Sequence, residues 1–232
     1  GIVMKADPQP GMPSYAQGWG PAVGWDDRGR VVSLGETTCV PVACYEDVLI
    51  TEEFSHAEPD AAQVKHYAPE VGNIQVTWQG MDASREVLDL TSLTQLTPEQ
   101  MTEVRAAAFE LEQSALEHSK EVYAATAPLE YSPDPTTVAE FWELDPANFG
   151  TSTNITMQPG THWVHEGTAV DDEGNPFTRR IEFMVTNLTK DIAGVNTVVA
   201  WIVDYTDDEI VEKELAFYAQ DKDGNVWYFG EH

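Results

Sequence analysis

The chain has 232 residues, of which 42% are hydrophobic and seven are Trp, a composition typical of a folded protein and not of an acidic disordered segment. Forty acidic residues against twelve Lys and Arg give a formal net charge of −28. A field of this sign repels nucleic-acid phosphates and anionic lipid headgroups, so we expect neither nucleic acid nor an anionic membrane as a partner. A surface with this charge is suited to high salt, where its self-repulsion is screened, and it is halophilic-like in this respect.

The N-terminal part of the chain is predicted to form short strands separated by turns. A Pro- and Gly-rich segment after Ile2–Met4 favours a loop or an edge strand. Asp26–Gly29 has the composition of a turn. The strands that we expect to follow are Arg30–Leu34, Thr38–Val42, Tyr45–Phe54, Gln63–Ala68, Asn73–Gln79 and Glu86–Leu93.

The two cysteines, Cys39 and Cys44, flank the sequence Val-Pro-Val-Ala, in which a turn would bring two strand ends together. This spacing favours a disulfide, with two free thiols as the alternative, and it is not that of a C-x-x-C redox or zinc motif. A disulfide implies an oxidising compartment. With no apolar run long enough to span a membrane and no signal peptide at Gly1, we expect the mature form of an extracellular or cell-surface protein, with the periplasm as an alternative.

From Thr97 the hydrophobic period changes to that of a helix. Thr97 is a suitable N-cap and Pro98 suits the first helical position. Apolar residues at alternating spacings of three and four form a stripe along this helix: Met101, Val104, Ala108, Leu111, Ala115 and Val122. His118 occupies the one position of the stripe that is not apolar. We expect a helix of about 25 residues that packs on its own sheet, or alternatively on a partner helix.

Strand patterns resume after a linker. Residues 124–156 are rich in Pro, Asp, Ser and Thr, with one short helix predicted at Val138–Leu144. The strands expected beyond them are His162–His165, Phe177–Asn187, Asn196–Asp204, Glu212–Ala219 and Asn225–Phe229.

Two distant stretches, Lys65–Gly80 (KHYAPEVGNIQVTWQG) and Phe217–Glu231 (FYAQDKDGNVWYFGE), share a Tyr-Ala pair followed by Gly-Asn, and each is predicted to be a β-hairpin. Similar spacings upstream of both predict a duplicated β-meander of about 70 residues. The fold class is therefore mainly β: two antiparallel meanders forming a sandwich or curved half-barrel, plus one long amphipathic helix. The expected boundaries are 1–96 for the first copy, 97–128 for the helix, 129–156 for the linker and 157–232 for the second copy, all within one pseudo-symmetric domain.

The segments YAQDKDGNVWYFGE, CVPVACYEDVLITEEF and KHYAPEVGN resemble an uncharacterised family of secreted bacterial β proteins. Related single-copy units look like the curved half-barrels of lipoprotein-carrier type. The resemblance covers about 170 residues, without the helix and the linker, and it implies a fold but no activity.

The resemblance also bears on chain order. In that family the copy with YAQDKDGNVWYFGE comes first, whereas here it comes second. We therefore expect residues 129–232 to precede 1–128 in the native polypeptide, with a circular permutation as the alternative. A normal peptide bond of about 1.33 Å between Pro128 and Leu129 would show that the present order is native.

The sequence offers few candidates for chemistry. Asp221, Asp223 and Asn225 follow the opening of a calcium loop, but the later Glu is missing, so a plain turn is the alternative to a calcium site. Asp171–Asn175 is a weaker copy of the same pattern. His162 and His165 should point to opposite faces of a strand and share no metal. We expect no cofactor other than calcium.

The sequence contains neither a Ser in a Gly-flanked elbow nor a thiol beside a His, so we do not expect an enzyme. The aromatic residues are expected mostly in the core, although an aromatic-lined concave face that binds a lipid or sugar is an alternative; they include Trp19, Trp25, Trp78, Trp201, Trp227, Tyr228 and Phe229.

Two functions fit these observations. The first is a non-enzymatic structural or interaction role, with self-association into a homo-oligomer through the helix or the sheet edges. The alternative is a carrier or binding protein for a small apolar ligand held in the concave sheet. An unfilled apolar cavity of several hundred cubic ångströms would favour the carrier.

Overall fold

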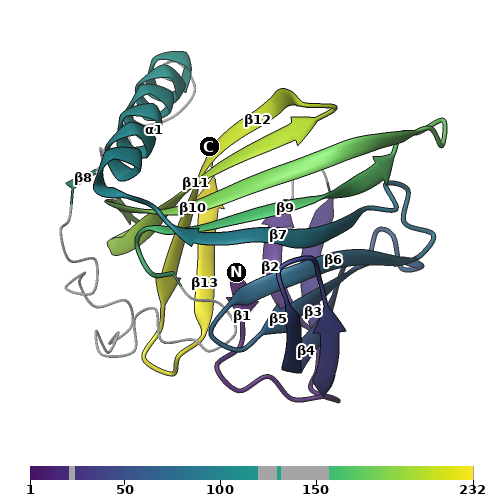
Figure 1. The fold of residues 1–232 in the computed structure, drawn as a ribbon. Coiled ribbons are helices and arrows are strands. Elements are labelled where there is room, and N and C mark those ends of the chain that lie inside the picture. The colour runs from purple at the N-terminus through teal and green to yellow at the C-terminus, as the bar shows by residue number, and fades with distance from the viewer. Residues whose placement is uncertain (21–23, 120–129, 132–156, 232) are drawn as a thin grey trace.

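In the described part of the chain, the fold is a single antiparallel sheet curled into a nearly closed barrel, with one helix on its outside (Figure 1). This computed structural model describes residues 1–20, 24–119, 130–131 and 157–231. The strands of the first half are β1 (Ile2–Met4), β2 (Tyr15–Gly20), β3 (Trp25–Cys39), β4 (Cys44–Phe54), β5 (Ala61–Ala68), β6 (Gly72–Gly80) and β7 (Val87–Gln95). The helix α1 (Pro98–Ser119) is followed by β8 (Glu130–Tyr131), β9 (Thr161–Val170), β10 (Pro176–Ile192), β11 (Val195–Thr206), β12 (Glu209–Gln220) and β13 (Val226–Glu231).

Two meanders of consecutive strands make up most of the barrel. Around the sheet the order is β1-β13-β12-β11-β10-β9-β7-β6-β5-β4-β3-β2, with β8 paired to β10 off this path. From β2 to β6, and again from β9 to β13, each strand therefore lies next to the strand that follows it in the chain. The fold class predicted from the sequence, a curved mainly β structure with a helix, is confirmed in its half-barrel form.

Two contacts close the sheet on itself. Strand β7 pairs with β9 and joins the two meanders, at a point where a Cβ on Gly167 would lie 1.8 Å from the carbonyl oxygen of Val87. Only glycine permits this close approach. On the opposite side β1 pairs with β13 and lies beside β2, where Gln17 Nε2 donates to the carbonyl oxygen of Val3 (3.4 Å). The two ends of the sheet thus come close together without pairing as strands, and the barrel is nearly closed.

The helix covers the outer face of β10 to β12. Thr97 and Gln100 form a capping box, in which Gln100 N donates to Thr97 Oγ1 (3.2 Å) and Thr97 N donates to Gln100 Oε1 (2.8 Å). Ala108 packs against a cluster that includes Trp201 and Phe217 of the sheet. Next to it, Lys190 of β10 and Glu112 of α1 form an ion pair in which both side chains are almost fully buried. The predicted packing of the helix on its own sheet is confirmed, and this explains why β11 is buried on both faces.

The disulfide between Cys39 and Cys44 is formed at the tip of the β3–β4 hairpin, as predicted. Val40 and Tyr45, beside the two cysteines, pack against the cluster that contains Ile74 and Trp163. The tip therefore lies against the apolar core of the barrel, and the disulfide holds it together.

Several sequence predictions need adjustment. Asp26–Gly29, predicted as a turn, lies inside β3, and the chain reverses earlier, between β2 and β3. Asp26 and Asp27 point to opposite faces of the strand, because side chains alternate along it. A strand tolerates two such acidic residues where both of its faces reach solvent. The predicted hairpins are both confirmed, but their loops differ: Ala68 pairs with Gly72 in the first, and Gln220 pairs with Val226 in the second.

Some predictions fall outside the described residues. They are the short helix at 138–144, most of the linker 129–156, Val122, the side chain of His118 and the bond between Pro128 and Leu129. The duplication, the domain boundaries and the chain order therefore stay predictions.

Candidate functional site

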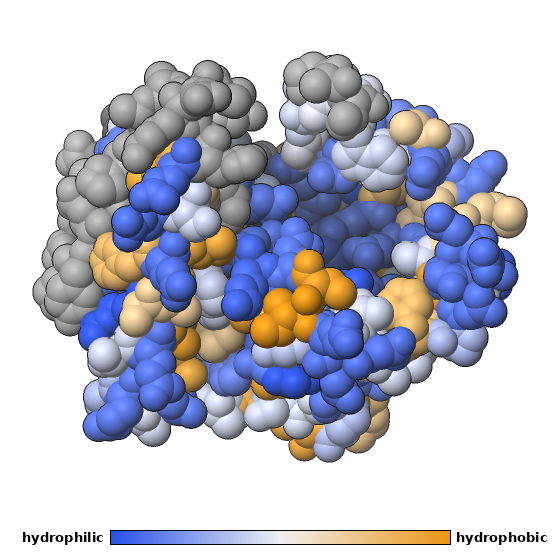
Figure 2. Space-filling model, turned by 90° about the horizontal axis from the view of Figure 1, so that it is seen from above, coloured by the Kyte–Doolittle hydropathy of each residue, from blue (hydrophilic) through white to orange (hydrophobic). Residues whose placement is uncertain are grey.

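The barrel contains a space with two adjoining parts. We call the first the inner compartment, a cavity of about 260 Å³, and the second the mouth, a cavity of about 400 Å³. Val3 and Tyr218 line both, so the two parts are neighbours, and together they are called the lumen here. Figure 2 shows the molecule hollowed on the face seen from above, with mostly hydrophilic residues around the hollow.

The walls of the inner compartment are largely apolar. Because side chains alternate along a strand, every second residue of the curved sheet points into the lumen. The apolar and aromatic wall residues come from seven strands and from the segment before β9, and they are Val3, Tyr67, Val76, Leu88, Met157, Trp163, Ile181, Phe183 and Tyr218. Lys65, Asn73 and His165 add polar groups to the same wall.

A row of aromatic rings connects the inner compartment with the mouth. The rings of Trp163 and Phe183 meet edge to face, with centroids 5.5 Å apart. Tyr218 follows at 6.0 Å from Phe183, and Tyr228 at 5.5 Å from Tyr218. These separations are typical of favourable aromatic pairs. The row gives the lumen a continuous apolar and polarisable wall from its interior to its opening.

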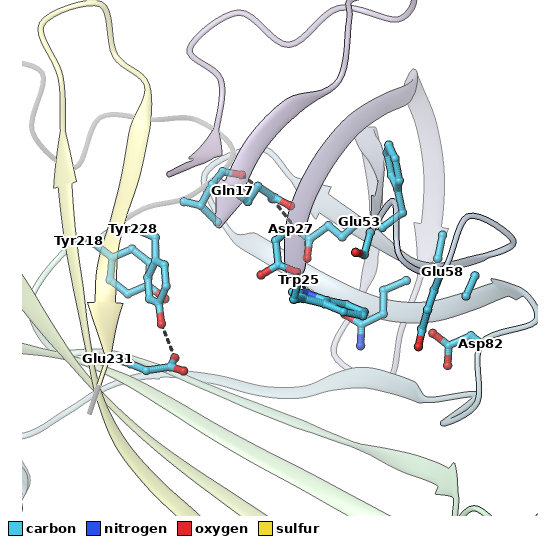
Figure 3. A pocket seen from close by; sticks show the side chains of 15 residues that line it. Gln17, Trp25, Asp27, Glu53, Glu58, Asp82, Tyr218, Tyr228 and Glu231 are labelled. Atoms are coloured by element: carbon cyan, nitrogen blue, oxygen red, sulfur yellow. Dashed lines mark hydrogen bonds between the residues drawn. The ribbon is translucent and has the colours of Figure 1, made fainter. Parts of the chain in front are cut away.

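The mouth, in contrast, is acidic. Among the described residues, its lining includes five carboxylates and no Lys, Arg or His; the carboxylates belong to Asp27, Glu53, Glu58, Asp82 and Glu231. Figure 3 shows Glu58 beside Asp82 on one side of the mouth and Glu231 on the other, where it accepts a hydrogen bond from Tyr228. Trp25 lies between them, and its Nε1 donates to Asp27 Oδ1 (2.5 Å).

Two basic residues within the sheet are already paired with carboxylates. Lys65 forms an ion pair with Glu53, whose Oε1 also accepts from Gln17 Nε2 (3.0 Å). Arg179 forms ion pairs with Asp204 and with Glu86, the latter at 3.4 Å from Nε to Oε1. These bases neutralise their own partners and leave the charge of the mouth negative.

Burial shifts the pKa of several groups around the lumen. Desolvation raises the pKa of Glu214 to about 8, helped by the nearby charge of Glu231, with which it also shares a hydrogen bond. Burial likewise raises the pKa of Tyr67 and of Tyr218, so both phenols stay neutral. Burial lowers the pKa of His165, which keeps its imidazole neutral while Nε2 donates to the carbonyl oxygen of Asn73 (3.0 Å).

The calcium candidate forms the predicted β12–β13 turn. Asp221 Oδ1 accepts from the backbone N of Asp223 (3.0 Å) and of Asn225 (2.9 Å), and its Oδ2 accepts from Trp227 Nε1 (2.7 Å). Asn225 Oδ1 accepts from Ala6 N (3.0 Å). These N–H groups occupy the oxygens that would bind the ion, which favours the turn over calcium. No group of three or more His, Cys, Asp or Glu in the described part of the chain could hold a metal.

Asp171 repeats this arrangement in the β9–β10 turn. Its Oδ1 accepts from the backbone N of Glu173 (2.9 Å) and of Asn175 (2.8 Å), as Asp221 does in the later turn. In both turns the Gly before the Asn has a positive φ, 85° at Gly174 and 90° at Gly224. The D-x-x-G-N pattern therefore builds one kind of turn twice.

The other site predictions have mixed outcomes. His162 and His165 do lie on opposite faces of β9: His165 lines the inner compartment, and His162 approaches Glu182 at 3.4 Å. The prediction of core positions is wrong for three of the aromatic residues, since Trp19 is 69%, Trp78 39% and Trp25 36% exposed. The central aromatic row is formed instead by Trp163, Phe183 and Tyr218. Of the sequence predictions, only the alternative of an aromatic-lined concave face anticipated such a row.

Comparison with protein-family models, with curated proteins and with solved structures gives no match for this chain. The resemblance to secreted β proteins therefore stays a prediction. No helix in the described ranges is both long and apolar enough to cross a membrane.

Proposed function

We propose that this protein is a carrier or binding protein that holds a small molecule with an apolar body inside its barrel. The observation that carries the proposal is the apolar inner compartment of about 260 Å³, which opens through a mouth of about 400 Å³. Ligand sites in proteins are typically concave, mostly apolar and of this order of size. An apolar core is normally close-packed, so space of this kind within a barrel is a feature of binding folds.

The shape of the lumen supports an elongated occupant. The aromatic row extends from Trp163 in the interior to Tyr228 in the mouth. The disulfide-tipped hairpin packs against the cluster that contains Trp163, so the interior end is backed by Val40 and Tyr45. A molecule would therefore enter through the mouth and extend its apolar part towards Trp163.

A hydrolytic role has less support from the lining residues. Ser55, the one Ser in the lining of the mouth, donates to Asp26 Oδ1 (3.0 Å). His56 contacts the other oxygen of the same carboxylate at 2.7 Å. A Ser nucleophile needs a base that accepts its proton, and here Asp26 lies between the hydroxyl and the imidazole. We therefore propose a binding function without catalysis.

We also propose that the protein acts outside the cytoplasm. The Cys39–Cys44 disulfide supports this location, because disulfides persist in oxidising compartments. Self-association through the helix or sheet edges has less support, since α1 packs on its own sheet and β1 lies beside β2. A ligand-free oligomer in solution would favour the structural role instead.

The proposal is tested by filling the inner compartment with a larger side chain. Ile181 lines this cavity, so Ile181→Trp should occupy it, whereas Ile210→Trp adds the same bulk at a half-exposed position. Binding is measured with phenylnaphthylamine, a neutral dye that fluoresces in apolar surroundings. We expect the wild type and Ile210→Trp to bind the dye and Ile181→Trp to lose it.

Two outcomes would refute the proposal. One is a wild type that does not bind the dye, and the other is equal binding by a folded Ile181→Trp variant. Thermal unfolding of each variant shows whether it is folded, and Val76→Trp, which lines the same cavity from β6, replaces Ile181→Trp if that variant does not fold.

A further inference from the structure

We infer that the ligand carries a positively charged group, such as an ammonium, which remains in the mouth while its apolar body occupies the inner compartment. This inference rests on the proposed binding function and adds the chemical class of the ligand. It follows from the charge and the aromatic faces of the mouth, taken in that order below.

The charge of the mouth favours a cation and disfavours an anion. Among the described residues, all five acidic or basic side chains that line it belong to Asp or Glu, and of these only Glu53 forms an ion pair with a base, Lys65. A concave site with low-dielectric walls concentrates such a field. A ligand carboxylate would be repelled there, and Lys65 already has its partner.

The aromatic residues of the mouth complement this charge. Trp25 is held by its hydrogen bond to Asp27, which fixes the indole ring beside a carboxylate. Tyr228 lies on the other side of the mouth, next to Glu231 (Figure 3). Aromatic faces combined with carboxylates bind ammonium groups in proteins, because the ring quadrupole and the negative charge act together.

The test compares three ligands with the same apolar chain and different headgroups: octylamine, 1-octanol and octanoate. Affinities are measured near neutral pH by displacement of phenylnaphthylamine and by calorimetry. We expect octylamine to bind about tenfold more tightly than octanol, since a hydrogen bond to a charged group contributes about 1.5–3 kcal/mol, and octanoate to bind most weakly. Added salt should weaken the binding of octylamine and leave that of octanol unchanged.

Isosteric variants locate the effect. The double variant Asp27→Asn/Glu58→Gln removes two charges of the mouth with little change in shape, and we expect it to reduce the preference for octylamine over octanol severalfold. Glu46→Gln is the matched control, because Glu46 is exposed at the opposite end of β4 from the mouth. It should leave the preference unchanged.

The outcomes separate the two proposals. Equal affinities for octylamine and octanol, or tighter binding of octanoate, would overturn the cationic ligand while leaving the binding function intact. A preference for octylamine that the double variant retains would also overturn it. No binding of any of the three compounds would refute the binding function itself. If the double variant does not fold, the headgroup series and its salt dependence on the wild type decide the question.

Discussion

Glu214 and Glu231 place two carboxyl groups next to each other at the edge of the mouth. Glu214 lies on β12, two residues from Ala216, which pairs with Glu231 of β13. Two adjacent carboxylates repel each other when both are ionised, and the folded protein relieves this by retaining a proton on one of them. Desolvation of Glu214 is the larger cause of its raised pKa, and this repulsion adds to it.

The raised pKa makes stability depend on pH in a defined direction. Between its ordinary value of 4.5 and about 8, Glu214 binds more proton in the folded than in the unfolded state, so folding stability decreases as pH rises through this window. Glu214→Gln removes the ionisation and should raise the melting temperature relative to the wild type at pH 8, with a much smaller difference at pH 4.5. Glu209→Gln, at an exposed position of the same strand, is the control. A difference that is constant across this pH range would contradict the account.

At the scale of residues, the sequence predicts structural roles better than binding roles. The short spacing of Cys39 and Cys44 was sufficient to predict their bond, because few residues can separate them in space. The carboxylates of the mouth could not be selected, since forty acidic residues are present and only the closure of the barrel brings five of them together.

The β3–β4 hairpin is the element that connects stability with the site. It is long and irregular, with register shifts between Val31 and Thr38. These irregularities bend a hairpin, and here its tip packs against the apolar cluster around Ile74 and Trp163. The disulfide ties the last cross-strand pair, Cys39 with Cys44.

Removing this disulfide should destabilise the protein. We expect Cys39→Ser/Cys44→Ser to lower the free energy of unfolding by about 2 kcal/mol, the value for a short closed loop. Urea denaturation of the variant and of the wild type measures the difference. Reduction of the wild type should have the same effect, whereas unchanged denaturation midpoints in both experiments would show that the tip is stable without its bond.

At the scale of elements, the local patterns of the sequence predict most strands and the helix but not all their partners. Alternation and turn residues locate both hairpins because these are local structures. The pairing of β7 with β9 was not predictable, since the two strands are separated in sequence by the helix and residues 120–156. Asp26–Gly29 was misassigned because Asp and Gly are typical of turns, whereas here they lie near the partly exposed start of β3.

The charge of −28 affects the molecule as a whole. Repulsion among so many carboxylates opposes the compact state, and salt screens it over a Debye length of about 10 Å at 0.1 M and about 3 Å at 1 M. We therefore expect the melting temperature to rise as salt increases from low to molar concentration. Parallel measurements in NaCl and KCl distinguish general screening from binding of a particular ion. A flat or falling curve would count against this explanation.

The closure of the barrel is the feature on which the binding function depends. The sequence left a sandwich and a curved half-barrel open, because both use the same alternating strands. A sandwich would fill its interior with the side chains of two facing sheets. The continuous sheet instead bends around the lumen, so that side chains from opposite walls leave the inner compartment between them.

A crystal structure of the protein soaked with ω-bromo-octanol tests this claim most directly, because anomalous scattering locates the bromine atom. The neutral headgroup makes the result independent of the charge of the mouth. We predict a bromine peak in the inner compartment, within contact distance of Trp163 or Phe183. An inner compartment filled by side chains, or a bromine peak only on the outer surface at saturating ligand, would contradict the account.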